Sequence, residues 1–270
     1  MQSTEARIGR VTLPGWALGV LGVIGVLVAW EAGSRVGVLD THSYPPPSRL
    51  FETAASITFE GFPRGITIDN HALATASRIV RGYGVAAVAA IPLGLLIGRS
   101  PVLDRASAPV VTFARSIATI SLLPLAVAWF GVGDLSRILL VAFGAFWIVL
   151  TNTVAAVKGV DPVLIHAART LGCQPSALFR RVILPASLPR IFGGLKVALG
   201  MAFLVIVAVE MIGTVEGLGA LIMEARTFYR TDVAIVGMAL LGLFGFLLAK
   251  ALDRLEAMLL PWSTPDEAAP

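Results

Sequence analysis

Charged residues are scarce in this sequence. Only 14% of the 270 residues are charged, against about 25% in a soluble domain, whose surface must be wetted. Cysteine is nearly absent, and because Cys173 stands alone no internal disulfide bond can form. The three histidines, His42, His71 and His166, lie too far apart to show the ligand spacing of a zinc site. No Gly-x-x-x-x-Gly-Lys-Ser/Thr stretch is present, so we expect no nucleotide site, and no metal or cofactor.

The basic residues do not form the stripe that a nucleic-acid surface would need. The formal net charge is +4 and the isoelectric point is near 9.7. The Lys and Arg residues lie between apolar runs, which is where a membrane protein needs them for orientation. We therefore expect a lipid bilayer around this chain and no nucleic-acid partner.

Long apolar runs are abundant, and 56% of the residues are hydrophobic with a mean hydropathy of +0.83. A helix needs about 20 apolar residues, within a range of about 17–25, to cross a bilayer core about 30 Å thick. No segment alternates apolar and polar residues as a membrane barrel would, and backbone groups in lipid must be satisfied internally. The sequence therefore predicts an all-α membrane protein with about six transmembrane helices. The runs cover residues 11–30, 82–98, 116–133, 138–157, 197–215 and 233–249.

The distribution of Lys and Arg predicts the orientation. If the N-terminus is cytoplasmic, thirteen of the 21 Lys and Arg residues fall on the cytoplasmic side and eight on the outer side. This bias predicts a multi-pass protein of the bacterial inner membrane with both termini in the cytoplasm. Arg78 and Arg81 count against this orientation unless their long side chains reach the outer membrane interface. The first run is predicted to be a retained anchor; a signal peptide, the alternative, has a shorter apolar core and small residues at its cleavage site.

Three parts of the chain differ in character. Residues 1–70 hold a short tail, the first span and an outer segment that contains the stiff run Tyr44-Pro45-Pro46-Pro47. Residues 71–262 form a five-helix core with a cytoplasmic loop at residues 158–192. Residues 263–270 form a polar tail.

The cytoplasmic loop carries the signals of two short helices joined by a glycine. Asp161 is placed to cap a helix that starts at Pro162, and Gly172 is placed to end it. A second helix is predicted from near Pro175, and we expect Leu184-Pro185 and Leu188-Pro189 to break it before the next span. The hairpin is too polar to cross the bilayer. From spacing alone, a docking element for another protein and an amphipathic linker on lipid headgroups are both open.

The same loop resembles the EAA loop of binding-protein-dependent ABC importer permeases. That pattern has Glu-Ala-Ala, three residues, Gly, then a hydrophobic residue and Leu-Pro at this spacing. Further stretches resemble the sulfonate, taurine and nitrate branch of this family, over roughly residues 70–262. The loop residues that match are His166-Ala167-Ala168-Arg169-Thr170-Leu171-Gly172, Phe179 and Leu184-Pro185; the branch motifs are Arg115-Ser116-Ile117, Leu123-Pro124-Leu125, Trp129-Phe130-Gly131-Val132-Gly133, Glu210-Met211-Ile212 and Gly217-Leu218-Gly219. His166 stands where the family usually has Glu, which puts the charge partner of that position in question.

The resemblance implies a type I ABC importer permease fold and a transport subunit that is not itself an enzyme. It implies as partners two cytoplasmic ATPase subunits that hydrolyse the ATP, a second permease copy as a homodimer, and an external substrate-binding protein. The implied cargo is a small organic anion such as an alkanesulfonate, taurine or nitrate. The residues that the resemblance assigns to ATPase coupling are His166, Ala167, Ala168, Arg169, Leu171, Gly172, Phe179, Leu184 and Pro185.

Hydroxyl groups near a cation mark one part of a candidate pathway. Ser116, Thr119 and Ser121 lie close in sequence to Arg115, which favours an anion in transit. Packing of helices through small polar residues is the alternative.

Glu210 marks a second part of the candidate pathway. An intramembrane carboxylate is costly unless it faces water or a partner. Two roles are open: Glu210 gates the outer mouth, or it pairs with Arg226 or Arg230 in the following loop.

Two other classes of membrane protein compete with the importer subunit. A self-sufficient secondary transporter or channel would be expected to show several intramembrane charges, whereas Glu210 is almost alone. A membrane enzyme would need clustered His, Asp or Glu at one face.

Overall fold

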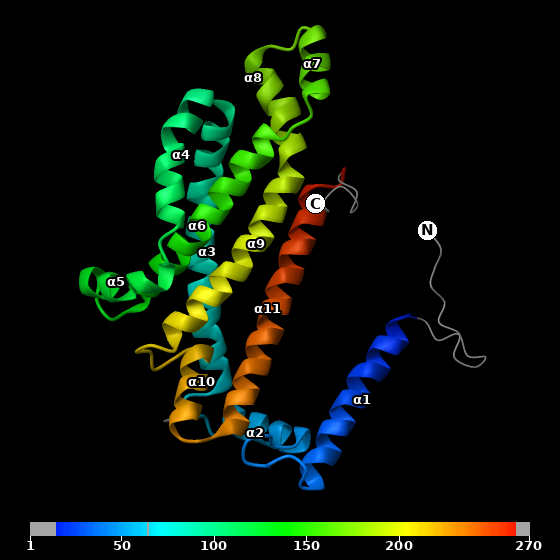
Figure 1. Ribbon diagram of the computed structural model, residues 1–270, viewed down its shortest axis with the longest axis vertical. Helices are drawn as coiled ribbons and strands as arrows, with labels where there is room; N and C mark the ends of the chain where they lie inside the picture. The colour runs from blue at the N-terminus through cyan, green and yellow to red at the C-terminus, as the bar shows by residue number, and fades with distance from the viewer. Residues whose placement is uncertain (1–14, 64, 263–270) are drawn as a thin grey trace, which may run out of the picture.

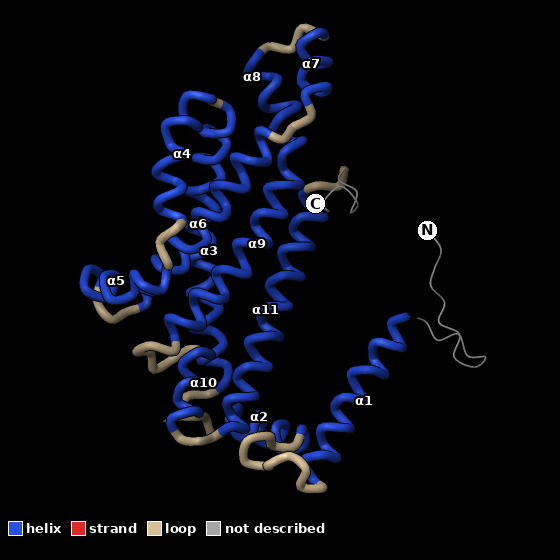
Figure 2. The backbone as a smooth tube through the Cα atoms, in the orientation of Figure 1, coloured by secondary structure: helices blue, strands red, loops and turns tan. Residues whose placement is uncertain are grey.

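The computed structural model describes residues 15–63 and 65–262, and all regular secondary structure in these ranges is helical (Figures 1 and 2). The all-α class predicted from the sequence is confirmed for these residues, while residues 11–14 of the first apolar run and the tail 263–270 lie outside them. The elements are α1 (Gly15–Arg35), α2 (Pro47–Phe59), α3 (Ile68–Arg99), α4 (Pro101–Arg115), η1 (Thr119–Leu122), α5 (Leu123–Phe130), α6 (Asp134–Lys158), α7 (Pro162–Thr170), α8 (Pro175–Leu178), η2 (Phe179–Ile183), α9 (Leu184–Glu210), α10 (Leu218–Thr227) and α11 (Thr231–Leu259).

Five helical segments among the described residues are long and apolar enough to cross a membrane. They are α1, α3, α6, the continuous run of α8, η2 and α9, and α11. A sixth crossing exists only if α4 and the η1–α5 segment are counted as one span, and these two are bent by 79°.

The third predicted span, residues 116–133, is not one straight helix. Ala118 takes an extended backbone, and η1 is a 3₁₀ turn. Pro124 lies in the first turn of α5, where it has no N–H for a preceding helix to use. The chain therefore turns at residues 116–118, and α5 projects sideways from the bundle (Figure 1).

Two other spans have boundaries that the distribution of charge did not reveal. Helix α3 starts at Ile68, well before residue 82, and it contains Arg78, of which only 4% is exposed. Helix α9 ends at Glu210 and not at residue 215. The prediction was wrong at the start of α3 because a buried charge that has partners does not terminate a helix. It was wrong at the end of α9 because the uncharged residues 211–215 belong to the turn that leads to α10.

Helices α3 and α6 pack closely through a stripe of small residues. Gly82, Ala86, Ala90, Gly94 and Gly98 recur every four residues on α3, and they face α6. A Cβ atom added at Gly94 would lie 2.7 Å from Thr153, and one added at Gly82 would lie 2.7 Å from the Ile138 carbonyl oxygen. Small residues let two helix backbones approach, which is how helices associate where lipid surrounds them.

Helix α9 covers the other side of α6, and the apolar core lies between α3, α6 and α9. Its most buried members include Val141, Ala145, Ala198, Ala202 and Val205. Helix α1 stands apart from this bundle and is only 6% buried along its apolar stretch (Figure 1). Its apolar surface suits lipid or another protein chain.

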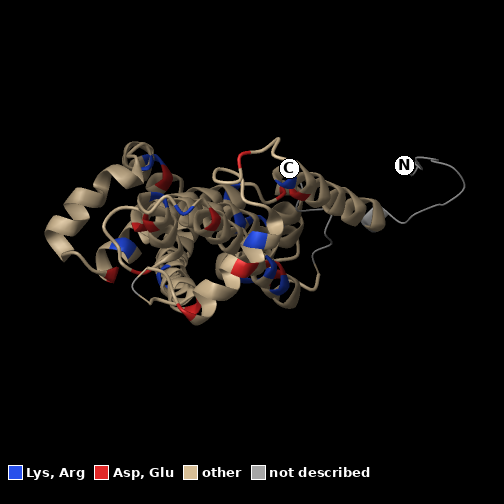
Figure 3. Ribbon diagram, turned by 90° about the horizontal axis from the view of Figure 1, so that it is seen from below, with Lys and Arg blue, Asp and Glu red and all other residues tan. Residues whose placement is uncertain are grey.

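The two ends of the bundle carry different structures. Helices α7 and α8 form one end, while α2 and α10 form the other (Figure 1). A small second core holds α2 and α10 against α11, and it includes Ile57, Leu221 and Val233. Viewed from the α2 and α10 end, charged residues are few and most of the helical surface carries none (Figure 3).

Candidate functional site

The α7–α8 hairpin (residues 161–183) has the local structure that its sequence predicts. The Asp161 carboxylate accepts a hydrogen bond from the Val163 N–H at 2.8 Å, which caps α7. Gly172 follows the end of α7 with φ +77°, a left-handed conformation that glycine adopts without strain. The Cys173 N–H then bonds to the Ala168 carbonyl oxygen at 3.0 Å and closes the turn.

The tip of this hairpin is exposed and partly apolar. No side chain of α7 is buried, and the exposed fractions are 70% for Val163 and 87% for Leu171. Helices α7 and α8 project from one end of the bundle (Figure 1). Of the nine residues that the resemblance assigns to ATPase coupling, the exposed ones are His166, Ala167, Arg169, Leu171 and Gly172.

The base of the hairpin is joined to the bundle. Ala168, Phe179, Leu184 and Pro185 are partly buried, and the Arg99 guanidinium at the end of α3 lies 5.6 Å from the centre of the Phe179 ring. The predicted breaks at Leu184-Pro185 and Leu188-Pro189 are absent, because the chain continues through the π-helical turn η2 into α9. A π turn provides the extra residue that lets a proline lacking its N–H follow without ending the helix.

A cavity of about 330 Å³, the bend cavity, lies where α4 turns into η1. Three predicted pathway residues, Arg115, Ser116 and Thr119, line it. Ser121 does not; its hydroxyl donates to the Ala118 carbonyl oxygen at 2.7 Å. The other lining residues were not predicted to line a pathway; they are Ile117, Ala118, Gly144, Trp147, Ile148, Thr151 and Met201.

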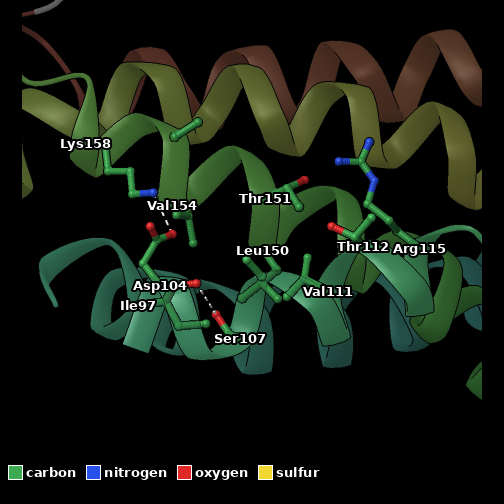
Figure 4. A pocket seen from close by; sticks show the side chains of 12 residues that line it. Ile97, Asp104, Ser107, Val111, Thr112, Arg115, Leu150, Thr151, Val154 and Lys158 are labelled. Carbon is green, nitrogen blue, oxygen red and sulfur yellow. Dashed lines mark hydrogen bonds and ion pairs between the residues drawn. The ribbon is translucent and has the colours of Figure 1, made fainter. Parts of the chain in front are cut away.

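A second cavity of about 280 Å³, the α4 chamber, lies between α4 and α6 (Figure 4). It shares Arg115 and Thr151 with the bend cavity. Lys158 and Asp104 form an ion pair of 2.5 Å at its far end. The remaining lining residues are Ile97, Ser107, Ala108, Val111, Thr112, Leu150, Val154 and Ala155.

Glu210 does not line either cavity but belongs to an ion cluster of Arg78, Asp134, Arg137 and Glu210, of which Asp134 is half-exposed and the other three are buried. Arg78 Nη1 lies 2.7 Å from Glu210 Oε1, and Arg78 Nε donates to Asp134 Oδ1 at 2.8 Å. Arg137 lies 3.4 Å from the same Asp134 oxygen. Our expectation that Glu210 is almost alone among intramembrane charges was therefore wrong.

The predicted pairing of Glu210 with Arg226 or Arg230 was also wrong. No hydrogen bond or ion pair among the described residues joins them, and Arg230 instead binds Asp232 with Nη2–Oδ2 at 2.8 Å. Thr53 on α2 donates to the same Asp232 oxygen at 2.9 Å, so this second pair fastens α2 to the start of α11.

The ion cluster holds the turn between α9 and α10. Arg78 Nη1 donates to the Glu216 carbonyl oxygen at 2.7 Å, and Arg137 Nη2 donates to the Gly213 carbonyl oxygen at 2.9 Å. The Thr75 hydroxyl donates to Glu210 Oε2 at 2.8 Å. This arrangement neutralises the buried charges and fixes residues 211–217, so the structure favours a positioning role for Glu210.

The helical bundle, the small-residue packing and the exposed hairpin define a multi-pass membrane transport subunit. The family described as binding-protein-dependent transport system inner membrane component matches residues 90–262, and the chain belongs to this family of ABC importer permeases.

Two relatives and one solved structure show how far the similarity extends. The chain is 34% identical over 254 residues to the taurine transport system permease protein TauC of Escherichia coli, covering 94% of this chain and 90% of TauC. It is 31% identical over 248 residues to the Bacillus subtilis protein SsuC, named as an aliphatic sulfonates transport permease, covering 92% and 88% of the two chains. A chain of the inward-facing MetNI methionine ABC transporter shares the fold, with a TM-score of 0.59 at 22% identity over 68% of this chain and 92% of that one. The predicted family and the type I fold are confirmed.

Proposed function

We propose that this chain is the permease subunit of an ATP-driven importer for a small organic anion of the sulfonate or taurine type. The exposed α7–α8 hairpin carries this proposal. An apolar tip that no helix of its own chain covers is a surface for another protein, and the continuous helix behind it can transmit motion to the bundle. The names of the relatives supply the class of cargo.

The nine residues assigned to ATPase coupling divide into two roles in this proposal. The exposed tip residues contact the ATPase. Ala168, Phe179, Leu184 and Pro185 hold the hairpin to the bundle, so that a displacement of the tip moves α9. His166 is exposed and offers the ATPase an imidazole where the family usually offers a carboxylate.

The anion passes the bend between α4 and α5 in this proposal. Arg115 has no hydrogen bond or ion pair to any described residue, so its charge is available to a solute. Ser116 and Thr119 add hydroxyl groups to the same cavity. An unpaired cation beside hydroxyl groups attracts an anion at a site too small for a large ligand.

Further partners and the orientation belong to the same proposal. Two ATPase subunits bind at the hairpin end, a second copy of this chain completes the pathway, and a binding protein delivers the anion to the α2 and α10 end. Both termini lie in the cytoplasm with the hairpin. Residues 71–262 form the moving core, and residues 1–70 anchor it.

Reconstitution into vesicles tests the importer. The chain is combined with a candidate ATPase and a candidate binding protein from the same organism, and uptake of radiolabelled taurine and ethanesulfonate is followed with ATP inside or outside. Uptake that requires all three components and ATP on the hairpin side supports the proposal. Uptake by the chain alone, driven by an ion gradient, would identify a secondary transporter, the second candidate.

The lone cysteine provides a test of orientation. In a Cys173→Ser background, Leu171→Cys places a thiol at the exposed tip of the hairpin. A membrane-impermeant maleimide should label it in inside-out vesicles and not in right-side-out vesicles. Labelling only from the outer side would place the hairpin where no ATPase could reach it.

A further inference from the structure

Arg115 and Lys158 lie at the two ends of the α4 chamber, and they differ in whether an acidic side chain neutralises their charge. Lys158 ends α6 and is bound by Asp104, whereas Arg115 ends α4 and has no ion pair within the described residues. Figure 4 shows the Lys158–Asp104 pair at one end of the chamber, Arg115 with Thr112 at the other, and Val111 and Leu150 between them. The chamber therefore has one neutralised cation and one free cation.

The chamber is of the size and polarity that a small solute requires. Its volume of about 280 Å³ lies below the range of about 300–1,000 Å³ that holds drug-sized ligands. Apolar side chains line its middle, and hydroxyl groups and cations line its ends. A molecule with a short apolar stem and one acidic group matches this distribution.

The ion pair limits how strongly the chamber attracts an anion. The Asp104 carboxylate lies 2.5 Å from the Lys158 ammonium group and neutralises its charge. An entering anion is therefore attracted mainly by Arg115. The Lys158–Asp104 pair is partly exposed, with 47% and 29% of the two side chains accessible, so it is open to competition from another acidic group.

We propose that the α4 chamber is an anion-binding site that takes a small organic monoanion, a sulfonate or a carboxylate. Arg115 binds the acidic group, and Asp104 competes with it for Lys158. The chamber shares Arg115 and Thr151 with the bend cavity. Its other end is at Lys158, the last residue of α6 before the α7–α8 hairpin. The α4 chamber is therefore the last binding site that the cargo occupies before it leaves on the hairpin side. This inference rests on the proposed function for the class of anion.

Charged thiol reagents test the chamber without transport or ATP. Two full-length variants are made in the Cys173→Ser background. One carries Thr112→Cys as the reporter beside Arg115, and the other carries Leu171→Cys as an exposed reference outside the chamber. The rates of modification by an anionic sulfonatoethyl and a cationic trimethylammonioethyl methanethiosulfonate are compared in lipid nanodiscs. One unit charge about 4 Å away in water changes each rate by about fivefold, in opposite directions for the two reagents, so the anion-to-cation rate ratio should be about 25-fold higher at Thr112→Cys than at the reference.

Charge variants make the test specific to the chamber. Arg115→Gln should bring the rate ratio at Thr112→Cys down to that of the reference. Lys250→Gln removes the same charge at a position that lines neither chamber nor bend cavity, and it should leave the ratio unchanged. An unchanged ratio in Arg115→Gln would overturn the assignment.

Competition by ethanesulfonate then identifies the ligand. It should slow labelling of Thr112→Cys, and ethyltrimethylammonium should not. Asp104→Asn releases Lys158 and should lower the half-protecting concentration of ethanesulfonate several-fold, whereas Lys158→Gln leaves Asp104 unpaired and should raise it. Damage to the fold would move both variants in the same direction, so shifts of one sign contradict the proposal.

A lipid headgroup offers the same acidic chemistry, and the nanodisc composition separates the two sources. Protection by ethanesulfonate in discs of phosphatidylcholine and in discs containing phosphatidylglycerol supports a solute site. If phosphatidylglycerol alone slows labelling and ethanesulfonate adds nothing in either disc, the chamber is a lipid site and the solute assignment is wrong. Neither result changes the outcome of the ATP-dependent uptake assay, which tests the proposed function separately.

Discussion

Arg78 and Glu210 form an ion pair of 2.7 Å between residues 132 positions apart in sequence, and the two side chains are 5% and 0% exposed. Arg78 lies on α3 and donates a hydrogen bond to the Glu216 carbonyl oxygen, in the turn at residues 211–217. Glu210 is the last residue of α9, directly before this turn. The pair therefore fixes the position of α3 relative to α9.

Loss of one partner of this pair should be strongly destabilising. Removing one member of a buried ion pair leaves the other charge uncompensated, which costs about 3–5 kcal/mol. We expect Arg78→Ala to lower the free energy of unfolding by about that amount, measured by denaturant titration of the purified chain in detergent. The matched control is Arg35→Ala, because Arg35 is 70% exposed in its pair with Glu31, where the cost should be about 0–1 kcal/mol. Equal losses in the two variants would show that burial does not govern the Arg78 pair.

Two glycines on α3 should respond differently to the same substitution. A side chain at Gly94 would meet Thr153 on α6, whereas nothing lies within 4 Å of a Cβ at Gly84. Gly94→Leu should separate α3 from α6 and destabilise the chain by about 1–3 kcal/mol or more, as overpacking does. Gly84→Leu should have little effect on the same denaturant curve. A neutral Gly94→Leu would mean that the α3–α6 contact is looser than its geometry indicates.

A bulky residue at Gly172 should uncouple ATP hydrolysis from transport. The residue has φ +77°, and a side chain there strains the turn that orients the hairpin tip. We expect Gly172→Val to insert and assemble, to retain ATPase activity, and to lose most ATP-driven uptake in reconstituted vesicles. Gly193→Val is the control, because Gly193 lies within α9 with open space around it. Normal uptake by Gly172→Val would remove the turn from the coupling mechanism.

The histidine at position 166 should accept the residue that the family usually carries. His166 is exposed on α7 and none of its side-chain atoms has a hydrogen bond to a described residue. His166→Glu should therefore leave the fold unchanged, and co-purification should show ATPase binding that is equal to or stronger than that of the parent chain. His166→Ala shows the effect of losing the imidazole without adding charge. Complete loss of assembly in His166→Glu alone would indicate that this ATPase offers a different surface.

Features encoded over a few neighbouring residues were predicted well from the sequence. The Asp161 cap, Pro162 at the start of α7 and the left-handed Gly172 follow from local backbone chemistry, so the hairpin was predicted almost residue by residue. The long apolar helices followed from composition in the same way.

Features that depend on distant partners were not predictable. A charge in an apolar run was interpreted as a helix boundary, but Arg78 lies inside α3 because Glu210 and Asp134 neutralise it. The bend near Ala118 and the proline-tolerant π turn at Phe179–Ile183 depend on small backbone changes that hydropathy does not record. The α4 chamber needs Asp104 and Lys158 to face each other across two helices, which only the packed structure reveals.

The unbroken helical run Pro175–Glu210 has a mechanical consequence. Its 36 residues reach about 54 Å at 1.5 Å per residue, which exceeds the thickness of the bilayer core. A stiff rod of that length amplifies angle into displacement: a tilt of about 5° at one end shifts the other by about 5 Å. Because Glu210 at the far end is bound by Arg78, a displacement at the hairpin end of this run would be transmitted to the opposite end of the bundle.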